Sequence, residues 1–324
     1  MTSRTSLSPR LAVTLGVLAG IGVATQAFVN GRLATSLGSP MYAAVASQTV
    51  GLAALTVAGV TTKAFVRASQ RLRAGGRLRW WHLAVSVIGA VNVVVSAAAA
   101  PKVGVALLTV SLVGGQCTGG LLADRLGLTP GAHRPLTLMR VVGAVIALAS
   151  VGLGALGARS HLDTSLLGLA LLAGIAFPLT QAAAGQMTSV TGEPFAAGTI
   201  SFAMGALGMV VFALAVTSAP PPSRWLAASP PEWVGGVIGA TTLMIAAVTI
   251  RILGAFRLTL SIVAGQAIGG LAVDLVVPAR GERITVLTIV SVFVVLLAVW
   301  ISGMTRGGGA TPDIPLGEAS SQSN

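Results

Sequence analysis

The chain has very little charge for its length. Only 9% of its 324 residues are charged, whereas 54% are apolar, and its mean hydropathy is +0.89. A soluble domain of this size needs far more charge to cover its surface, so most of this surface must face lipid. The sequence therefore predicts a membrane protein whose main partner is the lipid bilayer.

The motifs of several other protein classes are missing as well. The single cysteine, Cys117, cannot form an intrachain disulfide. No GxxxxGK[ST] motif is present, so ATP binding through a P-loop is excluded, and no HExxH or paired-cysteine pattern offers a zinc site. We expect no metal and no other cofactor. The net charge of +12 suggests nucleic acid, but the basic residues are scattered between apolar runs, so no nucleic-acid partner is expected.

What the chain does have is an internal repeat. The segment VGVALLTVSLVGGQCTGGLLAD, which ends at Asp124, returns 150 residues later as LGAFRLTLSIVAGQAIGGLAVD, which ends at Asp274. Over the last 18 residues of each copy, ten positions are identical. The two copies indicate that the chain arose by duplication.

A second part of the repeat settles how the amino terminus is interpreted. LAGI at 18–21 recurs at 172–175, and Gln26 matches Gln181 once one residue is inserted. The basic residues before the first apolar run resemble a secretory signal, but an internal copy cannot be a cleaved signal. We therefore expect the first apolar run to be a retained membrane span.

Apolar stretches of about 20 residues, long enough to cross a bilayer as a helix, occur ten times. Turn residues separate them, with Gly38-Ser39-Pro40 and Gly192-Glu193-Pro194 at equivalent places. A closed barrel would need short alternating strands instead. The sequence predicts an all-α polytopic membrane protein with spans at 11–34, 41–64, 80–100, 103–123, 136–157, 165–189, 195–217, 232–252, 255–276 and 284–304.

Five spans per copy is an odd number, so the second copy should enter the membrane from the opposite side. With the amino terminus inside, 14 of the 20 basic residues fall on the inner side, as positive-inside retention requires. We expect two inverted five-helix repeats with both termini cytoplasmic. The expected organisation is a cytoplasmic tail 1–10, a first repeat 11–157, an external linker 158–164, a second repeat 165–304 and a disordered cytoplasmic tail 305–324.

The residues also carry a resemblance to a known family. The first copy contains LAGIGVATQAFVNGRLATSLGSPMYAAVASQ, a Trp80-Trp81 pair, VIGA, GGQCTGGLLADRLGL and RPLTLMRVVG. Together these segments resemble the YdcZ (DUF606) family of the drug/metabolite transporter (DMT) superfamily, in its fused tandem form. The resemblance implies a bacterial-type inner-membrane exporter of unassigned substrate. It also implies that helices 1–4 and 6–9 surround a central cavity and that helices 5 and 10 lie outside it.

The polar residues inside the spans are the candidates for a substrate pathway. Inversion of the repeat predicts two pairs, Gln26 with Gln266 nearer the outside and Gln116 with Gln181 nearer the cytoplasm. The alternative is that these amides bridge neighbouring helices, which Gly115xxxGly119 and Gly265xxxGly269 would let approach closely; both interpretations stay open. The candidate pathway residues are Gln26, Asn30, Gln48, Asn92, Gln116, Gln181, Gln186 and Gln266.

Asp124 and Asp274 are the only repeated acids, each at the end of an apolar span. Ionisable groups in membranes often mark ion or proton relays, so both are candidates for ion coupling. An interfacial acid that caps a loop or pairs with Arg125 or Arg280 is the simpler interpretation, and we favour it. No acid lies near the middle of any span, unlike in small multidrug-resistance proteins.

The function predicted from the sequence is secondary-active export of a small metabolite or xenobiotic by alternating access. The chain is not expected to be an enzyme. Two alternatives remain, a non-transporting membrane scaffold and an intramembrane enzyme, although no clustered His, Cys or acidic residues support the enzyme. The solute is a small molecule that the sequence does not identify, and both a monomer and a homodimer remain open.

Overall fold

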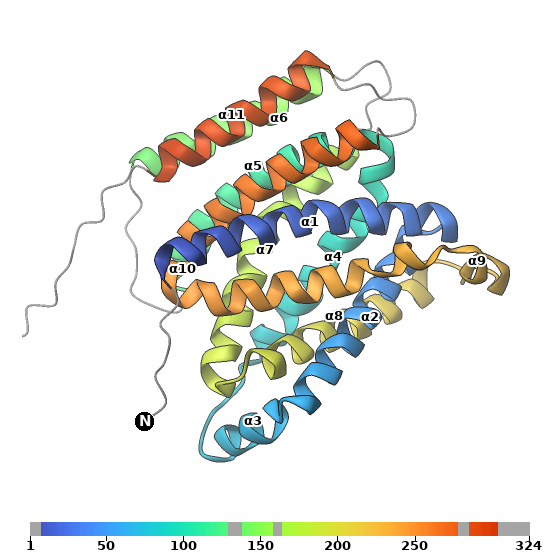
Figure 1. Ribbon diagram of the computed structural model, residues 1–324, viewed down its shortest axis with the longest axis vertical. Helices are drawn as coiled ribbons and strands as arrows, with labels where there is room; N and C mark the ends of the chain where they lie inside the picture. Colours follow the sequence, from blue (N-terminus) through green and yellow to red (C-terminus); the bar gives the residue numbers. More distant parts are fainter. Residues whose placement is uncertain (1–7, 129–137, 158–163, 278–284, 304–324) are drawn as a thin grey trace, which may run out of the picture.

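The computed structural model describes residues 8–128, 138–157, 164–277 and 285–303, and within these ranges its regular structure is entirely helical (Figure 1). Eight described segments are long and apolar enough to cross a membrane, and two further apolar helices have shorter described parts. The predicted all-helical membrane fold is confirmed at this level. The helices are α1 (Pro9–Leu37), α2 (Pro40–Thr61), α3 (Ala64–Arg73), α4 (Trp80–Val103), α5 (Val105–Arg125), α6 (Leu138–Gly157), α7 (Thr164–Thr191), α8 (Pro194–Val216), α9 (Pro222–Ala227), the 3-10 turn η1 (Pro230–Trp233), α10 (Gly235–Val276) and α11 (Val286–Gly303).

The predicted turns are present, and their local chemistry explains them. Gly38 ends α1 with a φ of 68°, a left-handed conformation that glycine adopts without strain. Ser39 then caps α2 by accepting a hydrogen bond from the Tyr42 backbone N–H at 3.4 Å, and Pro40 takes the first helical position. Gly192, with a φ of 72°, separates α7 from α8 at the equivalent place.

One break that the sequence predicts between two spans is instead a bend within a single helix. Residues 235–276 form one continuous helix, where the sequence predicts two spans separated at 253–254. Thr242 and Ile262 both lie against the Ala19–Gly20 segment of α1, although 20 residues of straight helix would hold them about 30 Å apart. The helix is therefore folded back into two arms, which Figure 1 shows joining beside the α10 label.

Two short helices were not expected from the sequence. α3 occupies the basic segment after α2, and α9 lies in the connection between α8 and α10. Arg224 of α9 donates a hydrogen bond at 3.2 Å to the carbonyl oxygen of Leu37, so α9 lies at the carboxyl end of α1. α3 contacts the α7–α8 turn instead. Figure 1 shows α3 and α9 at separate ends of the bundle.

Two glycine crossings hold the two copies together. A Cβ on Gly20 of α1 would overlap the Ile262 carbonyl on the second arm of α10, and a Cβ on Gly174 of α7 would overlap the Leu112 carbonyl on α5. Gly20 and Gly174 occupy equivalent places in the two LAGI segments. Each crossing joins a helix of one copy to a helix of the other, so the two copies interlock.

α6 and α11 form an outer pair. They pack against each other and, through a cluster of buried side chains that includes Ala147 and Val295, against α5 and the second arm of α10. Figure 1 shows them along one edge of the bundle. This agrees with the expectation that helices 5 and 10 of the family fold lie outside the central group.

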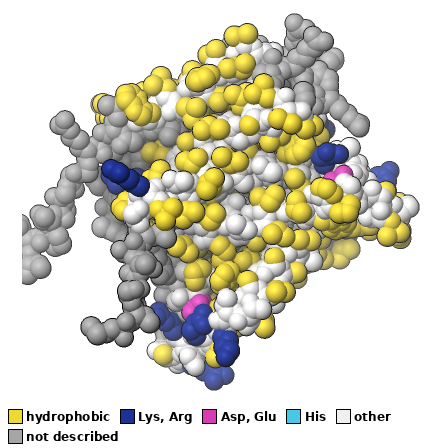
Figure 2. Space-filling view, in the orientation of Figure 1, with side chains coloured by type: hydrophobic (Ala, Val, Ile, Leu, Met, Phe, Trp, Pro, Cys, Tyr) yellow, Lys and Arg dark blue, Asp and Glu magenta, His cyan; other side chains and the backbone are white. Residues whose placement is uncertain are grey.

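The surface matches a protein surrounded by lipid. Large apolar side chains such as Leu207 and Phe212 of α8 and Phe293 of α11 are exposed. In the face shown in Figure 2, hydrophobic side chains cover most of the middle of the molecule, whereas basic and acidic side chains gather toward its ends. Such a belt is too large for a soluble monomer and is typical of a membrane-embedded surface.

Candidate functional site

A cavity opens between the two copies. It encloses about 820 Å³, counting the space at its open mouth, and six helices line it: α1, α2 and α4 of the first copy, and α7, α8 and the first arm of α10 of the second. None of its lining residues is charged. No described side chain of α5, α6 or α11 belongs to its wall.

Five carboxamides line this cavity, and all five are predicted pathway residues. Gln26 and Asn30, four residues apart on α1, face it together because that spacing places them on one side of a helix. Gln48 of α2, Asn92 of α4 and Gln181 of α7 complete the set. The repeat partners Gln26 and Gln181 therefore reach the same cavity from opposite copies.

Three glycines of the second copy make room for amides of the first. A Cβ on Gly239 would meet the amide of Gln26, one on Gly235 the Oδ1 of Asn30, and one on Gly205 the amide of Gln48. Each of these amides thus lies directly against a helix of the other copy. Their positions depend on small residues across the interface as well as on their own helices.

Among the residues that the structure describes, none donates a hydrogen bond to these five carboxamides or accepts one from them. Asn30, Asn92 and Gln181 each keep an amide oxygen that is buried and has no partner. An unpartnered buried amide costs about 1–3 kcal/mol of folding free energy, so native proteins rarely hold several together. The arrangement suits an external solute or water that would supply the missing partners.

The sequence interpretation missed the hydroxyl and aromatic part of the lining. Ser96 lies one turn after Asn92 on α4, and Thr180 directly precedes Gln181. Phe177 and Phe202 supply apolar surface. Spacing relative to the carboxamides could have indicated Ser96 and Phe177, each four residues from an amide. The remaining polar lining residues are Ser86, Ser201 and Thr242.

The predicted glutamine pairing is wrong. Nε2 of Gln116 donates a hydrogen bond to Oε1 of Gln266 at 3.1 Å, and both side chains are fully buried away from the cavity. α1 and the second arm of α10 run parallel with Gly20 opposite Gly265, so Gln26 lies about 7.5 Å beyond the level of Gln266 along the helix axis. Counting from the predicted span ends did not capture this offset.

Gln186 also lies outside the cavity lining. Its Oε1 is 3.1 Å from Nε2 of His82, and its Nε2 donates to the carbonyl oxygen of Leu128 at 2.6 Å. His82 accepts a hydrogen bond at Nδ1 from the backbone N–H of Arg79, so its Nε2 carries the proton toward Gln186. This chain of hydrogen bonds ties the start of α4 to the end of α7 and the segment after α5.

Asp274 acts as a helix cap in the structure. Its two carboxylate oxygens accept hydrogen bonds from the backbone N–H groups of Val105 and Ala106, at 2.9 and 2.7 Å. These are orphan donors at the start of α5, which a carboxylate satisfies well. The favoured interpretation of an interfacial cap therefore describes the contacts of Asp274. The side chain of Asp124 lies outside the described residues.

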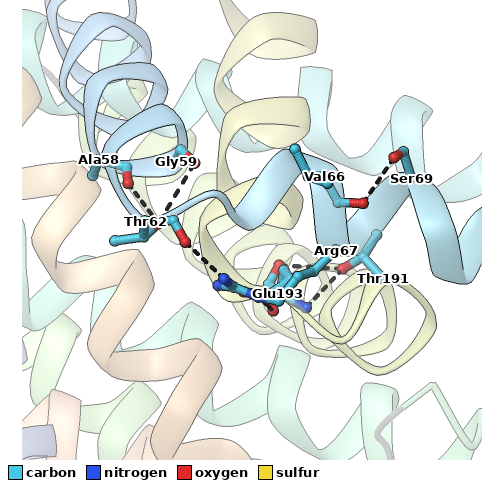
Figure 3. Close-up of polar contacts among 8 residues, drawn as sticks. All are labelled: Ala58, Gly59, Thr62, Val66, Arg67, Ser69, Thr191 and Glu193. Carbon is cyan, nitrogen blue, oxygen red and sulfur yellow. Dashed lines mark hydrogen bonds and ion pairs between the residues drawn. The ribbon is translucent and has the colours of Figure 1, made fainter.

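The end of the bundle near α3 has an ion pair between the copies. Arg67 of α3 contacts Glu193 in the α7–α8 turn through Nε to Oε1 and, at 3.0 Å, through Nη2 to Oε2 (Figure 3). The hydrogen bond from Arg67 lowers the pKa of Glu193, and the same contact raises the pKa of Arg67. Arg67 also donates to the Thr62 carbonyl at 2.7 Å. The pair fixes α3 to the second copy.

An all-helical bundle of membrane-crossing length, with an uncharged polar cavity between two interlocked copies, defines a polytopic membrane protein. Residues 11–153 and 165–301 match the model of a family described as "Putative inner membrane exporter, YdcZ", and the chain belongs to this family in tandem form. This membership indicates a transporter of the inner membrane rather than an enzyme.

No curated protein matches the chain. Five solved chains do match. One of them, described as "Crystal structure of protein", has a TM-score of 0.57 at 16% sequence identity, and the match covers 89% of this chain and 96% of that chain. At this identity the likeness shows a shared fold alone.

Proposed function

We propose that the protein is a secondary-active exporter that moves a small, net-neutral polar metabolite or xenobiotic through the cavity by alternating access. The observation that carries this proposal is the convergence of five carboxamides, three of them with a buried oxygen that has no partner, on one uncharged cavity between the copies. Carboxamides both donate and accept hydrogen bonds and carry no charge, so they suit neutral or zwitterionic solutes. Phe177 and Phe202 suit an apolar face on the same solute.

The architecture that goes with this proposal has ten membrane-crossing helices in two inverted five-helix repeats. α6 and α11, together with the eight longer segments, would supply the ten spans. The start of α4 lies beside the end of α7 through His82 and Gln186, which supports opposite directions for these two helices. A binding site between inverted repeats near the midplane is the usual construction of secondary transporters.

The proposed orientation has both termini and α3 in the cytoplasm. α3 presents Arg67, Arg71 and Arg73 at the end of the bundle where α7 finishes. Positive-inside retention favours the cytoplasm for such a cluster. α9 and the end of α1 would then face outward, and the exported solute would leave at that end.

The proposal is tested by flux in proteoliposomes against a panel of neutral, zwitterionic and charged metabolites. A variant with Gln26→Leu and Gln181→Leu removes one repeat-related pair of amides from the cavity. Thr249→Val is the matched control, because Thr249 is fully buried and bonds only within its own helix, outside the cavity lining. We expect the control to retain the flux of a neutral or zwitterionic solute and the double variant to lose it.

The alternative of a non-transporting scaffold predicts a different result. A scaffold would show no flux for any solute and would tolerate the cavity substitutions without change. If the double variant kept the flux of the wild type, the protein would be a transporter, but the solute would not pass through the cavity.

A further inference from the structure

A second cleft lies on a different face of α1 from the cavity. It encloses about 980 Å³, counting the space at its mouth, and is lined by the last three turns of α1, the α4–α5 junction, η1 and the end of α10. Its charged lining residues are Arg32, Glu232 and Asp274. Unlike the cavity, this cleft offers charged groups to a bound species.

Glu232 is the residue in this cleft whose bonding is incomplete. Its side chain belongs to η1, and the residue is only 7% exposed. Ser229 donates a hydrogen bond from Oγ to Oε1 of Glu232 at 2.9 Å, and the Ser229-x-x-Glu232 spacing is that of a helix-start capping box. This local role accounts for one carboxylate oxygen. The other, Oε2, is buried and has no hydrogen-bond partner.

The other charged residues of the cleft do not bind Oε2 of Glu232. Arg32 of α1 lies 5.9 Å from the ring centroid of Phe28 and forms no ion pair with Glu232, since Arg67–Glu193 is the one salt bridge within the described part of the chain. Asp274 uses both oxygens to cap α5.

Within the described residues, the other helices around η1 add no further cation to the cleft lining. α2, which also packs on η1, carries Tyr42 as its only titratable side chain. Lys102, which follows the lining residue Pro101, is exposed and does not line the cleft. A buried carboxylate oxygen without a partner is costly and calls for a positive partner.

We propose that Glu232 is a binding site for a small cation: a proton, a monovalent metal ion or the ammonium group of an amine. The unpartnered Oε2 supplies the ligand atom, and the cleft supplies the route to it. Oε2 is closed off from solvent, so a metal ion or an ammonium group requires the side chain to turn into the cleft, whereas a proton needs no such rearrangement.

The position of Glu232 connects this site to the cavity. Gly235, one turn further along the chain, makes room for Oδ1 of Asn30, which lines the cavity. Occupation of Glu232 can therefore shift the backbone that faces Asn30. The cation site stands independently of solute transport, and its test uses binding rather than flux.

The test uses two tryptophans as local reporters. Trp233 follows Glu232 in the chain, and its ring centroid is 5.9 Å from that of Trp225. Replacing Trp80, Trp81 and Trp300 with Phe leaves these two as the only tryptophans in the full chain. Fluorescence of the purified protein is then followed in three separate titrations, with pH, with sodium chloride and with methylammonium chloride. Choline chloride is the control for ionic strength, because its nitrogen has no N–H.

We expect a saturable fluorescence change in at least one titration, and its loss in Glu232→Gln. A response to pH alone identifies the proton, and a response to sodium or methylammonium identifies the larger cation. Ser229→Ala retains the carboxylate and should keep the response with a shifted midpoint. A flat signal in all three titrations, or a response unchanged in Glu232→Gln, would overturn the proposal.

A second measurement needs no substitution. A hydrophobic carbodiimide reacts with protonated carboxyl groups inside membrane proteins, and mass spectrometry of peptides locates the adduct. In the wild-type protein we expect modification at Glu232 that declines as pH rises or as the bound cation is added. Absence of modification at Glu232 across the pH range, together with a flat fluorescence titration, would exclude the site.

Discussion

Gln116 donates a hydrogen bond of 3.1 Å to Gln266, which occupies the equivalent place in the other copy. Both side chains are fully buried. Their remaining amide atoms, Oε1 of Gln116 and Nε2 of Gln266, have no hydrogen-bond partner. The pair joins α5 to the second arm of α10. It is a contact between the copies that removal of either side chain would break.

Gln116→Leu should destabilise the protein, because it leaves the Gln266 amide buried with no partner at all. The expected loss is about 1–3 kcal/mol in the free energy of unfolding. Replacing both glutamines with Leu should recover much of that loss, since no polar group is then stranded. Unfolding of the purified protein in detergent, measured for both single variants and the double variant, gives the coupling directly. Additive losses would show that the two amides do not depend on each other.

The cavity amides should behave in the opposite way. Asn92 has a buried amide oxygen without a partner, so Asn92→Leu removes a desolvated polar group and breaks no hydrogen bond between described residues. We expect the unfolding temperature of Asn92→Leu to match or exceed that of the wild type, while flux of the transported solute falls. Functional sites commonly lower stability in this way. A clear loss of stability without loss of flux would assign Asn92 to packing.

The sequence predicted much of this site because helical spacing carries the information. Gln26 and Asn30 are one turn apart, and the repeat identifies Gln181 as the counterpart of Gln26. These relations hold within a helix or between copies, so no knowledge of packing is required. Gln48 and Asn92 also line the cavity, but they have no counterpart in the second copy, so the repeat did not single them out.

The sequence could not predict the register between packed helices, that is, which residues of different helices lie at the same depth. The pairing of Gln116 with Gln266 depends on the register between Gly20 and Gly265, which backbone contact sets and no hydropathy pattern records. The bend in α10 could not be predicted either, because an uninterrupted apolar helix and two helices joined by a tight bend have nearly the same composition. Short helices such as α3, whose sequence is polar and basic, carry no span signal.

The ion pair between Arg67 and Glu193 should loosen in acid. The pKa of Glu193 is lowered in the folded protein, so its stabilising contribution is present above the unfolded value of about 4.3 and is lost as pH falls through the lower folded value. Hydrogen exchange of the α3 amides should therefore quicken, relative to intrinsic rates, below about pH 4.3. In Glu193→Gln the same amides should exchange quickly already at pH 6. Equal protection of α3 in both proteins at pH 6 would show that the pair does not hold α3.

Asp274 should contribute to folding through the α5 cap. Asp274→Ala leaves the N–H groups of Val105 and Ala106 without acceptors, which typically costs about 0.5–2 kcal/mol. Asp274→Asn keeps one acceptor oxygen and should lose less. Unfolding measurements on the two variants provide the comparison. If Asp274→Asn retained full stability but abolished flux, Asp274 would be a coupling residue as well as a cap.

The proposed orientation predicts opposite labelling of two surface positions. Cys117 is the only cysteine and is buried, so Cys117→Ala provides a background without thiols. Ser69 of α3 and Ser223 of α9 are both exposed, and α9 lies at the carboxyl end of α1 while α3 lies at the carboxyl end of α7. In intact cells a membrane-impermeant maleimide should label Ser223→Cys and leave Ser69→Cys unlabelled until the membrane is opened. The reverse pattern would place both termini outside, and labelling of both positions in intact cells would rule out a single fixed orientation.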